Sequence, residues 1–240
     1  MNSRKKNIKS PKTLAIDIGG SGLKAIVLSS TGKPLSERVR VATPKPATPK
    51  ALISALGKLV ADLPDFDRVS VGFPGVVTEG VVHTAVNLAH ASWVGFDLQK
   101  RLAKLFGTPV RVLNDAGVQG HGVIEGRGVE MLLAFGTGMG CALFVDGRYV
   151  PNLELAHHPF KNGETYEDYV GQAALDRIGA AKWNKRVAEV VALVLPIFNP
   201  RKLYLGGGNS RLIRFRLPPR VHKTKNIAGL LGGIALWRNT

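Results

Sequence analysis

Two kinds of apolar pattern alternate along the chain. In residues 52–63, apolar side chains recur every three or four positions, behind a Thr48-Pro49 pair that is typical of a helix start. In residues 67–75, they crowd into a short run that ends in Pro-Gly, which is typical of a strand and a turn. By the same criteria we expect further helices over 98–106, 187–198 and 226–237, and further strands over 109–115 and 202–209. This alternation is typical of an α/β fold.

A segment near the start of the chain recurs about half a chain later. Residues 14–28, LAIDIGGSGLKAIVL, align with residues 131–145, MLLAFGTGMGCALFV, so that Gly19 falls on Gly136. Each copy is an apolar strand, a glycine-rich turn and a second apolar strand. We therefore expect two related lobes, each of which opens with a β-hairpin.

The turn of the first copy carries polar groups that a plain hairpin does not need. Asp17 lies near the end of the strand, and three glycines, Ser21 and Lys24 follow. Glycines serve ordinary hairpins, but bare N–H groups can also approach an anion closely. The stretch alone favours the hairpin, since it matches neither common glycine fingerprint of nucleotide sites. Two more glycine turns after strands, at 136–140 and 206–209, favour a phosphate chain or nucleotide between two lobes.

Asn114 and Asp115 end the strand predicted over 109–115. Ligands of α/β sheets gather at the carboxyl ends of strands. A carboxylate there can accept a proton from a substrate hydroxyl as that oxygen attacks phosphorus. An Asp that caps the following helix is the more common role, and the pair by itself favours the cap.

The segment ELAHH places Glu154 and His157 close together. Such a group suits a sugar, whose hydroxyls both donate and accept hydrogen bonds, but it also suits zinc or a hydrated loop. Thr165 and Asp168 have the spacing of a capping box, which would put Glu167 in the first turn of a helix.

Bulk composition changes this picture little. The chain has 240 residues, enough for one large domain or two small ones, with 45% hydrophobic and 21% charged residues. No apolar run approaches the length of a membrane span, so we expect no membrane partner. Residues 1–12 are basic and lack an apolar core, which predicts a disordered tail rather than a secretory signal. The single cysteine, Cys141, excludes internal disulfides and favours a reducing, cytoplasmic location.

The net charge is the unusual bulk feature. The chain has 33 Lys and Arg against 17 Asp and Glu, a formal charge of +16. Such an excess favours a polyanionic partner, although a solvated basic surface is the ordinary alternative. The charge is concentrated in residues 1–12 and 211–225. Neither stretch has the interleaved aromatic residues of a single-strand binder, so we expect no nucleic-acid partner.

Together the motifs resemble the ROK family of sugar kinases, in the actin/hexokinase-like superfamily. The order DIGGSGLK, GFPG, ND, GTGMG, E-x-x-H and GGGN spans nearly the whole chain, and GETYEDYVG and NPRKLYLGGGN resemble the polyphosphate glucokinase branch. The resemblance implies an α/β, ribonuclease H-like duplicated fold with two lobes and a central cleft. We expect an N-terminal lobe over 13–115, joined by a C-terminal helix over 226–240, and a C-terminal lobe over 116–225.

The resemblance also implies an enzyme and its site. The reaction would move the terminal phosphoryl group of inorganic polyphosphate, or of ATP as well, to the 6-hydroxyl of glucose, with Asp115 as the base and Mg²⁺ between the phosphate oxygens and Asp17. The sugar-binding positions match Asn87, Asn114, Asp115, Glu154, His157, Glu167 and Gly75. The phosphate segments match Asp17, Gly19, Gly20, Ser21 and Lys24, and Gly136, Thr137, Gly138 and Gly140. The segment that holds adenosine in ATP-using members matches Gly206, Gly207 and Gly208.

Two features depart from the family pattern. The cysteine-rich zinc site of many members is missing, so we expect no zinc. The glycine before the motif histidine is replaced by Ala156, whose methyl group is expected to shift His157 slightly.

Two other functions stay open. A strictly ATP-dependent hexose kinase is favoured by the intact GGGN turn at 206–209. A non-catalytic sugar-binding regulator is disfavoured, because Asp115 is present and too few residues precede Leu14 for a helix-turn-helix domain. The family further implies a cytoplasmic homodimer.

Overall fold

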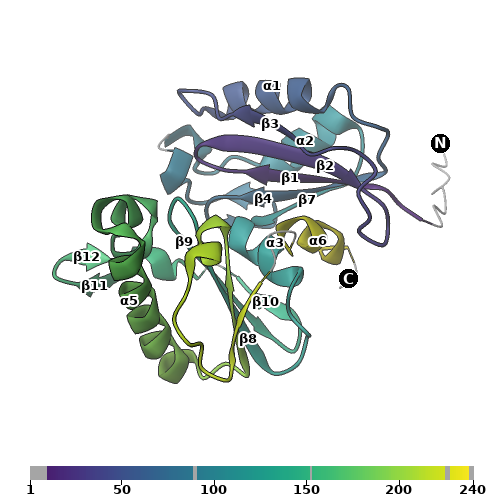
Figure 1. Ribbon diagram of the computed structural model, residues 1–240. Helices are drawn as coiled ribbons and strands as arrows, with labels where there is room; N and C mark the ends of the chain where they lie inside the picture. Colours follow the sequence, from purple (N-terminus) through teal and green to yellow (C-terminus); the bar gives the residue numbers. More distant parts are fainter. Residues whose placement is uncertain (1–9, 89–90, 152, 225–227, 238–240) are drawn as a thin grey trace.

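The computed structural model describes residues 10–88, 91–151, 153–224 and 228–237 (Figure 1). Most of the predicted basic tail, residues 1–9, lies outside the described residues, as do both ends of the helix expected over 226–240. In the described part, no helix is both long enough and apolar enough to cross a membrane.

The N-terminal half forms a five-stranded sheet in the order β3, β2, β1, β4, β7 (Figure 1). The strands are β1 (Thr13–Ile18), β2 (Gly22–Leu28), β3 (Val39–Ala42), β4 (Arg68–Phe73) and β7 (Val110–Asn114). β1 pairs antiparallel with β2 and parallel with β4. Leu14, Ile16 and Ile18 point into a core with α1 (Pro49–Val60) and α2 (Leu98–Phe106). Because side chains alternate along a strand, Ala15 and Asp17 face the other way.

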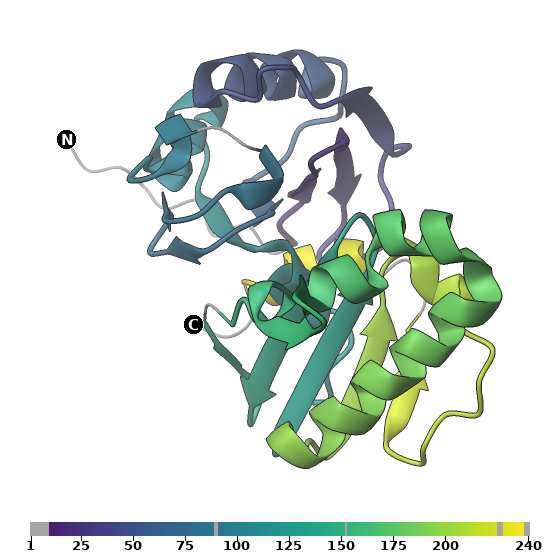
Figure 2. The same cartoon turned by 90° about the vertical axis from the view of Figure 1, so that its left-hand side faces the viewer.

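The C-terminal half repeats this plan. Its sheet has the order β10, β9, β8, β13, β14, again with a central antiparallel hairpin and two parallel neighbours. The strands are β8 (Val129–Phe135), β9 (Met139–Val145), β10 (Arg148–Val150), β13 (Lys202–Gly206) and β14 (Val221–Lys223). The long helix α5 (Gln172–Phe198) packs on this sheet (Figure 2). The duplicated, two-lobed α/β fold expected from the sequence repeat is therefore confirmed.

The repeat holds almost residue for residue, with one difference at the turns. β2 and β9 have the same length, and their first residues have the same separation in sequence as Gly19 and Gly136. In the first hairpin Ile18 pairs with Leu23, whereas in the second Phe135 pairs with Met139. The first turn is therefore one residue longer than the second, and the two turns present different groups.

The predicted helices match in position, and one is longer than expected. α1 begins behind Thr48, whose side chain caps it, and α2 has the predicted bounds. α5 begins well before 187. Its first half buries only Ala174 and Trp183 and so shows little apolar periodicity, which is why this half was not predicted as helix. Its backbone breaks at Gly179, where φ is 76°.

The smaller elements lie around the connections. They are β5 (Val77–Thr78), β6 (Val81–Val82), η1 (Val86–Leu88), η2 (Ala91–Trp93), η3 (Leu155–His157), β11 (Pro159–Lys161), β12 (Glu164–Thr165), α4 (Tyr166–Val170) and η4 (Gly208–Leu212). Several of them bring loops to the space between the two sheets.

Two short helices, α3 (Asp115–His121) and α6 (Ala228–Ala235), lie between the sheets (Figure 1). Their backbones touch at Gly232, where an added Cβ would lie 1.6 Å from the carbonyl oxygen of Val118. α6 is also tied to the first sheet, since Ser70 Oγ donates to the Gly233 carbonyl at 2.5 Å and Trp237 Nε1 donates to Ser70 Oγ at 2.8 Å. The end of the described chain therefore packs against its first strands.

Candidate active site

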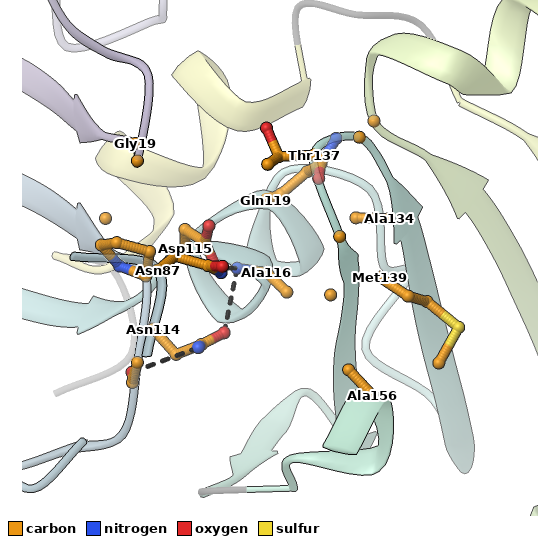
Figure 3. Close-up of a pocket in the computed structure, with 18 of the residues that line it drawn as sticks. Gly19, Asn87, Asn114, Asp115, Ala116, Gln119, Ala134, Thr137, Met139 and Ala156 are labelled. Atoms are coloured by element: carbon orange, nitrogen blue, oxygen red, sulfur yellow. Dashed lines mark hydrogen bonds between the residues drawn. The ribbon is translucent and has the colours of Figure 1, made fainter. Parts of the chain in front are cut away.

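A cleft of about 460 Å³ lies between the two sheets and is lined from both of them (Figure 3). Every residue predicted to bind substrate or phosphate lines it except Gly206. The lining residues from that prediction are Asp17, Gly19, Gly20, Ser21, Lys24, Gly75, Asn87, Asn114, Asp115, Gly136, Thr137, Gly138, Gly140, Glu154, His157, Glu167, Gly207 and Gly208. Segments far apart in the sequence thus meet at one place.

Asn114, and not Asp115, caps α3. Its Oδ1 accepts hydrogen bonds from the N–H groups of Ala116 and Gly117, at 3.0 and 3.2 Å, and its Nδ2 donates to the Gly75 carbonyl at 3.2 Å (Figure 3). Asn114 is therefore committed to holding α3 against the GFPG loop. The cap leaves Asp115 as the first residue of α3, with its carboxyl group in the cleft.

Asp115 is held where ionisation is costly. Burial raises the pKa of its carboxyl group, the charges of Asp17 and Glu154 raise it further, and the N–H of Ala116 partly offsets them. The resulting pKa is about 7. Its Cα lies over Gly72, where an added Cβ would come within 3.3 Å. A carboxyl group with this pKa can both take up and release a proton near neutral pH.

The first glycine turn is fixed from both sides. Asp17 accepts a hydrogen bond from Lys24 Nζ at 2.7 Å, across the β1–β2 pair. The Thr43 hydroxyl donates to the Gly19 carbonyl at 2.5 Å. The backbone of Asn87 passes directly over Gly20, where an added Cβ would lie 2.8 Å from its carbonyl oxygen. The turn therefore needs glycine for packing, and its residues line the cleft.

The second glycine turn holds the carboxylate of Glu167. Its Oε2 accepts from the Met139 N–H at 3.3 Å, and an added Cβ at Gly138 would lie 1.7 Å from the same oxygen. The capping box of Thr165 and Asp168 is present and starts α4, which orients Glu167 toward the cleft. The predicted place of Glu167 in the first helical turn is confirmed.

Glu154 and His157 face each other across one turn of η3. His157 Nε2 lies 3.4 Å from Glu154 Oε2. Burial raises the pKa of Glu154, His157 lowers it and Glu167 raises it. Ala156 is 5% exposed and belongs to the core under β9 and α4, so its methyl group is accommodated while His157 lines the cleft.

Gly207 and Gly208 form the third glycine turn at the cleft, after β13. Gly207 has φ of 79°, and an added Cβ would lie 2.2 Å from the Phe135 carbonyl oxygen. Gly206 still belongs to β13 and packs near Gln119 and Thr224, and it does not itself line the cleft. Of the three glycines predicted at this turn, two therefore line the cleft.

Several cleft residues were missed by sequence reasoning. Arg38 lies just before the short edge strand β3, and the alternation of Arg and Val over 38–41 is a strand signal that could have found it. Gln119 follows Asp115 by one helical turn and could have been found from that spacing. Cys141 also lines the cleft, where burial, aided by the charge of Glu154, raises its pKa to about 12. Its thiol therefore stays protonated at neutral pH.

Comparison with known proteins settles the family. The model of the ROK family matches residues 13–151. A polyphosphate glucokinase of Mycobacterium tuberculosis is 34% identical over 234 residues, covering 90% of this chain and 88% of that protein. The chain belongs to the ROK family.

Solved structures of ROK proteins agree with the fold. An inorganic polyphosphate/ATP-glucomannokinase from Arthrobacter sp. strain KM matches with a TM-score of 0.83 at 33% identity, covering 94% of this chain and 99% of that one. A ROK glucokinase from Streptomyces griseus, solved with glucose and AMPPNP, matches with a TM-score of 0.76 at 21% identity, over 95% and 100% of the two chains. The actin/hexokinase-like class expected from the sequence is confirmed.

Proposed function

We propose that this ROK protein is a polyphosphate glucokinase, which transfers the terminal phosphoryl group of inorganic polyphosphate to the 6-hydroxyl of glucose. One observation carries the chemistry: the Asp115 carboxyl group, with a pKa of about 7, lies in a cleft between glycine turns of both lobes. The similarity to curated polyphosphate glucokinases supports the donor. ATP serves as a second donor, as the name of the Arthrobacter relative indicates for that protein.

In this proposal Asp115 accepts the proton of the sugar 6-hydroxyl as its oxygen attacks the terminal phosphorus. The bond from that phosphorus to the bridging oxygen breaks, and the shortened polyphosphate leaves with the electron pair. Glu154, His157, Glu167 and Asn87 hold the sugar hydroxyls. Phosphoryl transfer depends mainly on positioning and on neutralising charge, which the backbone N–H groups of the glycine turns supply.

Asp17 is the residue that we propose for Mg²⁺. One of its oxygens, Oδ2, is paired with Lys24, and its side chain is 44% exposed toward the cleft. Mg²⁺ usually binds through one or two carboxylates, waters and substrate phosphates, so a single exposed carboxylate beside the phosphate turn fits. Bound there, the ion would neutralise charge on the phosphate oxygens. Among the described residues, no group of three or more His, Cys, Asp and Glu is arranged to hold a metal by itself.

A donor comparison with the Asp115→Asn variant tests this function. Purified protein with Mg²⁺ and glucose is given long-chain polyphosphate or ATP, and glucose 6-phosphate is measured. We expect turnover with polyphosphate, and a fall of about 10²- to 10⁴-fold in the variant, the usual contribution of a general base.

Other outcomes of this comparison redirect the proposal. Turnover with ATP alone would favour the strictly ATP-dependent hexose kinase. Turnover that the variant retains in full would remove Asp115 as the base. Absence of turnover with both donors would favour a sugar-binding protein.

We also propose a homodimer in the cytoplasm. The resemblance to ROK kinases supports the dimer, and the single buried cysteine is compatible with a reducing compartment. Light scattering of the purified chain measures its molar mass against the 25.7 kDa of one copy.

A further inference from the structure

The edge strand β3 and the residue before it place two arginines beside the first glycine turn. In the strand register Arg40 pairs with Lys24, and Lys24 pairs with Asp17. Residues paired in this way lie on one face of a sheet, so the three side chains form a row on the cleft-facing side. Arg38 lies two residues before Arg40 and shares this face, and it lines the cleft itself.

Arg40 is in contact with the turn. An added Cβ at Gly22 would lie 2.9 Å from Arg40 Nε and 3.1 Å from its Nη2, so the guanidinium group lies across the backbone of Gly22. Thr43, the residue directly after β3, donates a hydrogen bond to the Gly19 carbonyl. β3 is thus attached along the turn that faces the phosphates.

Acidic side chains outnumber Lys and Arg in the cleft lining. Four carboxylates line it, against Lys24 and Arg38 as the only Lys or Arg among its lining residues in the described chain. Lys24 is paired with Asp17, whereas the ion pairs of the described residues include neither Arg38 nor Arg40. Arg38 and Arg40 are therefore cationic groups beside the first glycine turn without an ion-pair partner among the described residues, and they attract a polyanion that extends from that turn. The carboxylates are Asp17, Asp115, Glu154 and Glu167.

We propose that Arg38 and Arg40 form a subsite for the phosphate groups of inorganic polyphosphate that lie beyond the one being transferred. The inference rests on the proposed function. A guanidinium group offers paired N–H donors that match two oxygens of a phosphate. A long chain continues past the glycine turn onto this subsite, whereas ATP ends in its nucleoside. The subsite therefore binds long-chain polyphosphate and does not contact ATP.

The test compares Arg38→Gln/Arg40→Gln with a control of equal charge, Arg101→Gln/Lys104→Gln, whose exposed residues lie on α2, outside the cleft lining. We expect the first variant to raise the KM for long-chain polyphosphate about tenfold or more. Its slope of log KM against log salt should fall by about 1.4, since each phosphate contact on a flexible chain contributes about 0.7. The KM values for ATP and glucose should stay within about twofold, and the control should match the wild type.

Two outcomes overturn the subsite. The first is a polyphosphate KM equal to that of the control. The second is an equal loss with ATP, which would place the arginines at the transferred phosphates. Equilibrium binding of long-chain polyphosphate without glucose keeps this test separate from the proposed function. If the wild type does not turn polyphosphate over, the proposed donor is wrong, yet affinity lost in the variant and kept in the control still supports the subsite. Equal affinities overturn it.

Discussion

At the scale of single residues, Asp115 has the ionisation that its proposed role requires. A general base works best when its pKa lies near the working pH, and burial brings this carboxyl group to about 7. We expect kcat/KM to fall about tenfold for each pH unit below 7 and to level off above it, because only the ionised group accepts a proton. A pH–rate profile with saturating donor checks this. A profile that stays flat down to about pH 5 contradicts it.

The same ionisation has a cost in stability. The pKa of Asp115 is raised from its ordinary value of 3.8 to about 7, so between these two pH values the folded protein holds the proton more tightly than the unfolded chain. The proton bound by Asp115 stabilises the folded protein, so the free energy of unfolding falls as pH rises toward 7 and this proton is lost. We expect Asp115→Asn to be more stable than the wild type at about pH 8, by on the order of 2–4 kcal/mol, and nearly equal to it at about pH 4. Urea denaturation at both pH values measures the difference.

At the scale of elements, the second glycine turn and α4 are interlocked through Glu167. Gly138→Ala would put a methyl group within 1.7 Å of Glu167 Oε2, so the carboxylate must leave its place. We expect the KM for glucose to rise about tenfold or more, by loss of one charged hydrogen-bonding group. Steady-state kinetics with varied glucose measure this rise.

Gly136→Ala in the same turn is the matched comparison. An added Cβ at Gly136 meets no atom within 4 Å and projects into open space. We expect it to leave the KM for glucose unchanged. If both alanines raise the KM for glucose equally, Glu167 does not contact the sugar.

The elements also show how far sequence alone carries the argument. Thr48, the capping box of Thr165 and the glycine hairpins are local signals, and their elements were predicted correctly. That Asn114 caps α3 was not predicted, because both Asn and Asp cap helices and only the GFPG loop packed beside Asn114 decides between them.

The glycine turns and carboxylates of the cleft were predicted from motifs, whereas the two arginines at β3 were not. Glycine turns and carboxylates carry a recognisable pattern, so most of the lining residues could be named. Arg40 belongs to the short strand β3 and Arg38 directly precedes it, and the alternation of Arg and Val over 38–41 was not used as a strand signal. Their place in the site follows from pairing with β2, which is a tertiary contact and leaves no local signal.

At the scale of the whole molecule, the two sheets are set relative to each other by α3 and α6. Gly232→Ala would force a methyl group into the Val118 carbonyl, 1.6 Å away, and helix backbone cannot yield as a side chain can. We expect a loss of stability on the order of 3 kcal/mol and loss of turnover, since a cleft lined from both sheets depends on their alignment. Thermal unfolding and kinetics measure both effects.

The control for that variant is another glycine in a helix. Gly57→Ala in α1 meets only the flexible end of Leu105, at 3.7 Å. We expect it to stabilise the protein by about 0.5–1 kcal/mol, the usual gain from alanine in a helix interior. If the two variants behave alike, the close crossing of α3 and α6 does not set the alignment.

The packing of α6 also bears on how the chain folds as it is made. Ala15, Ile26 and Leu28, from the first two strands, form a small core with Ile234. Because synthesis proceeds from the N-terminus, this face of the first sheet stays uncovered on the ribosome until residue 234 has emerged. The hairpin made first is therefore among the last parts to be completed. Until then, its apolar face is a surface that a chaperone can hold and that a neighbouring nascent chain can bind.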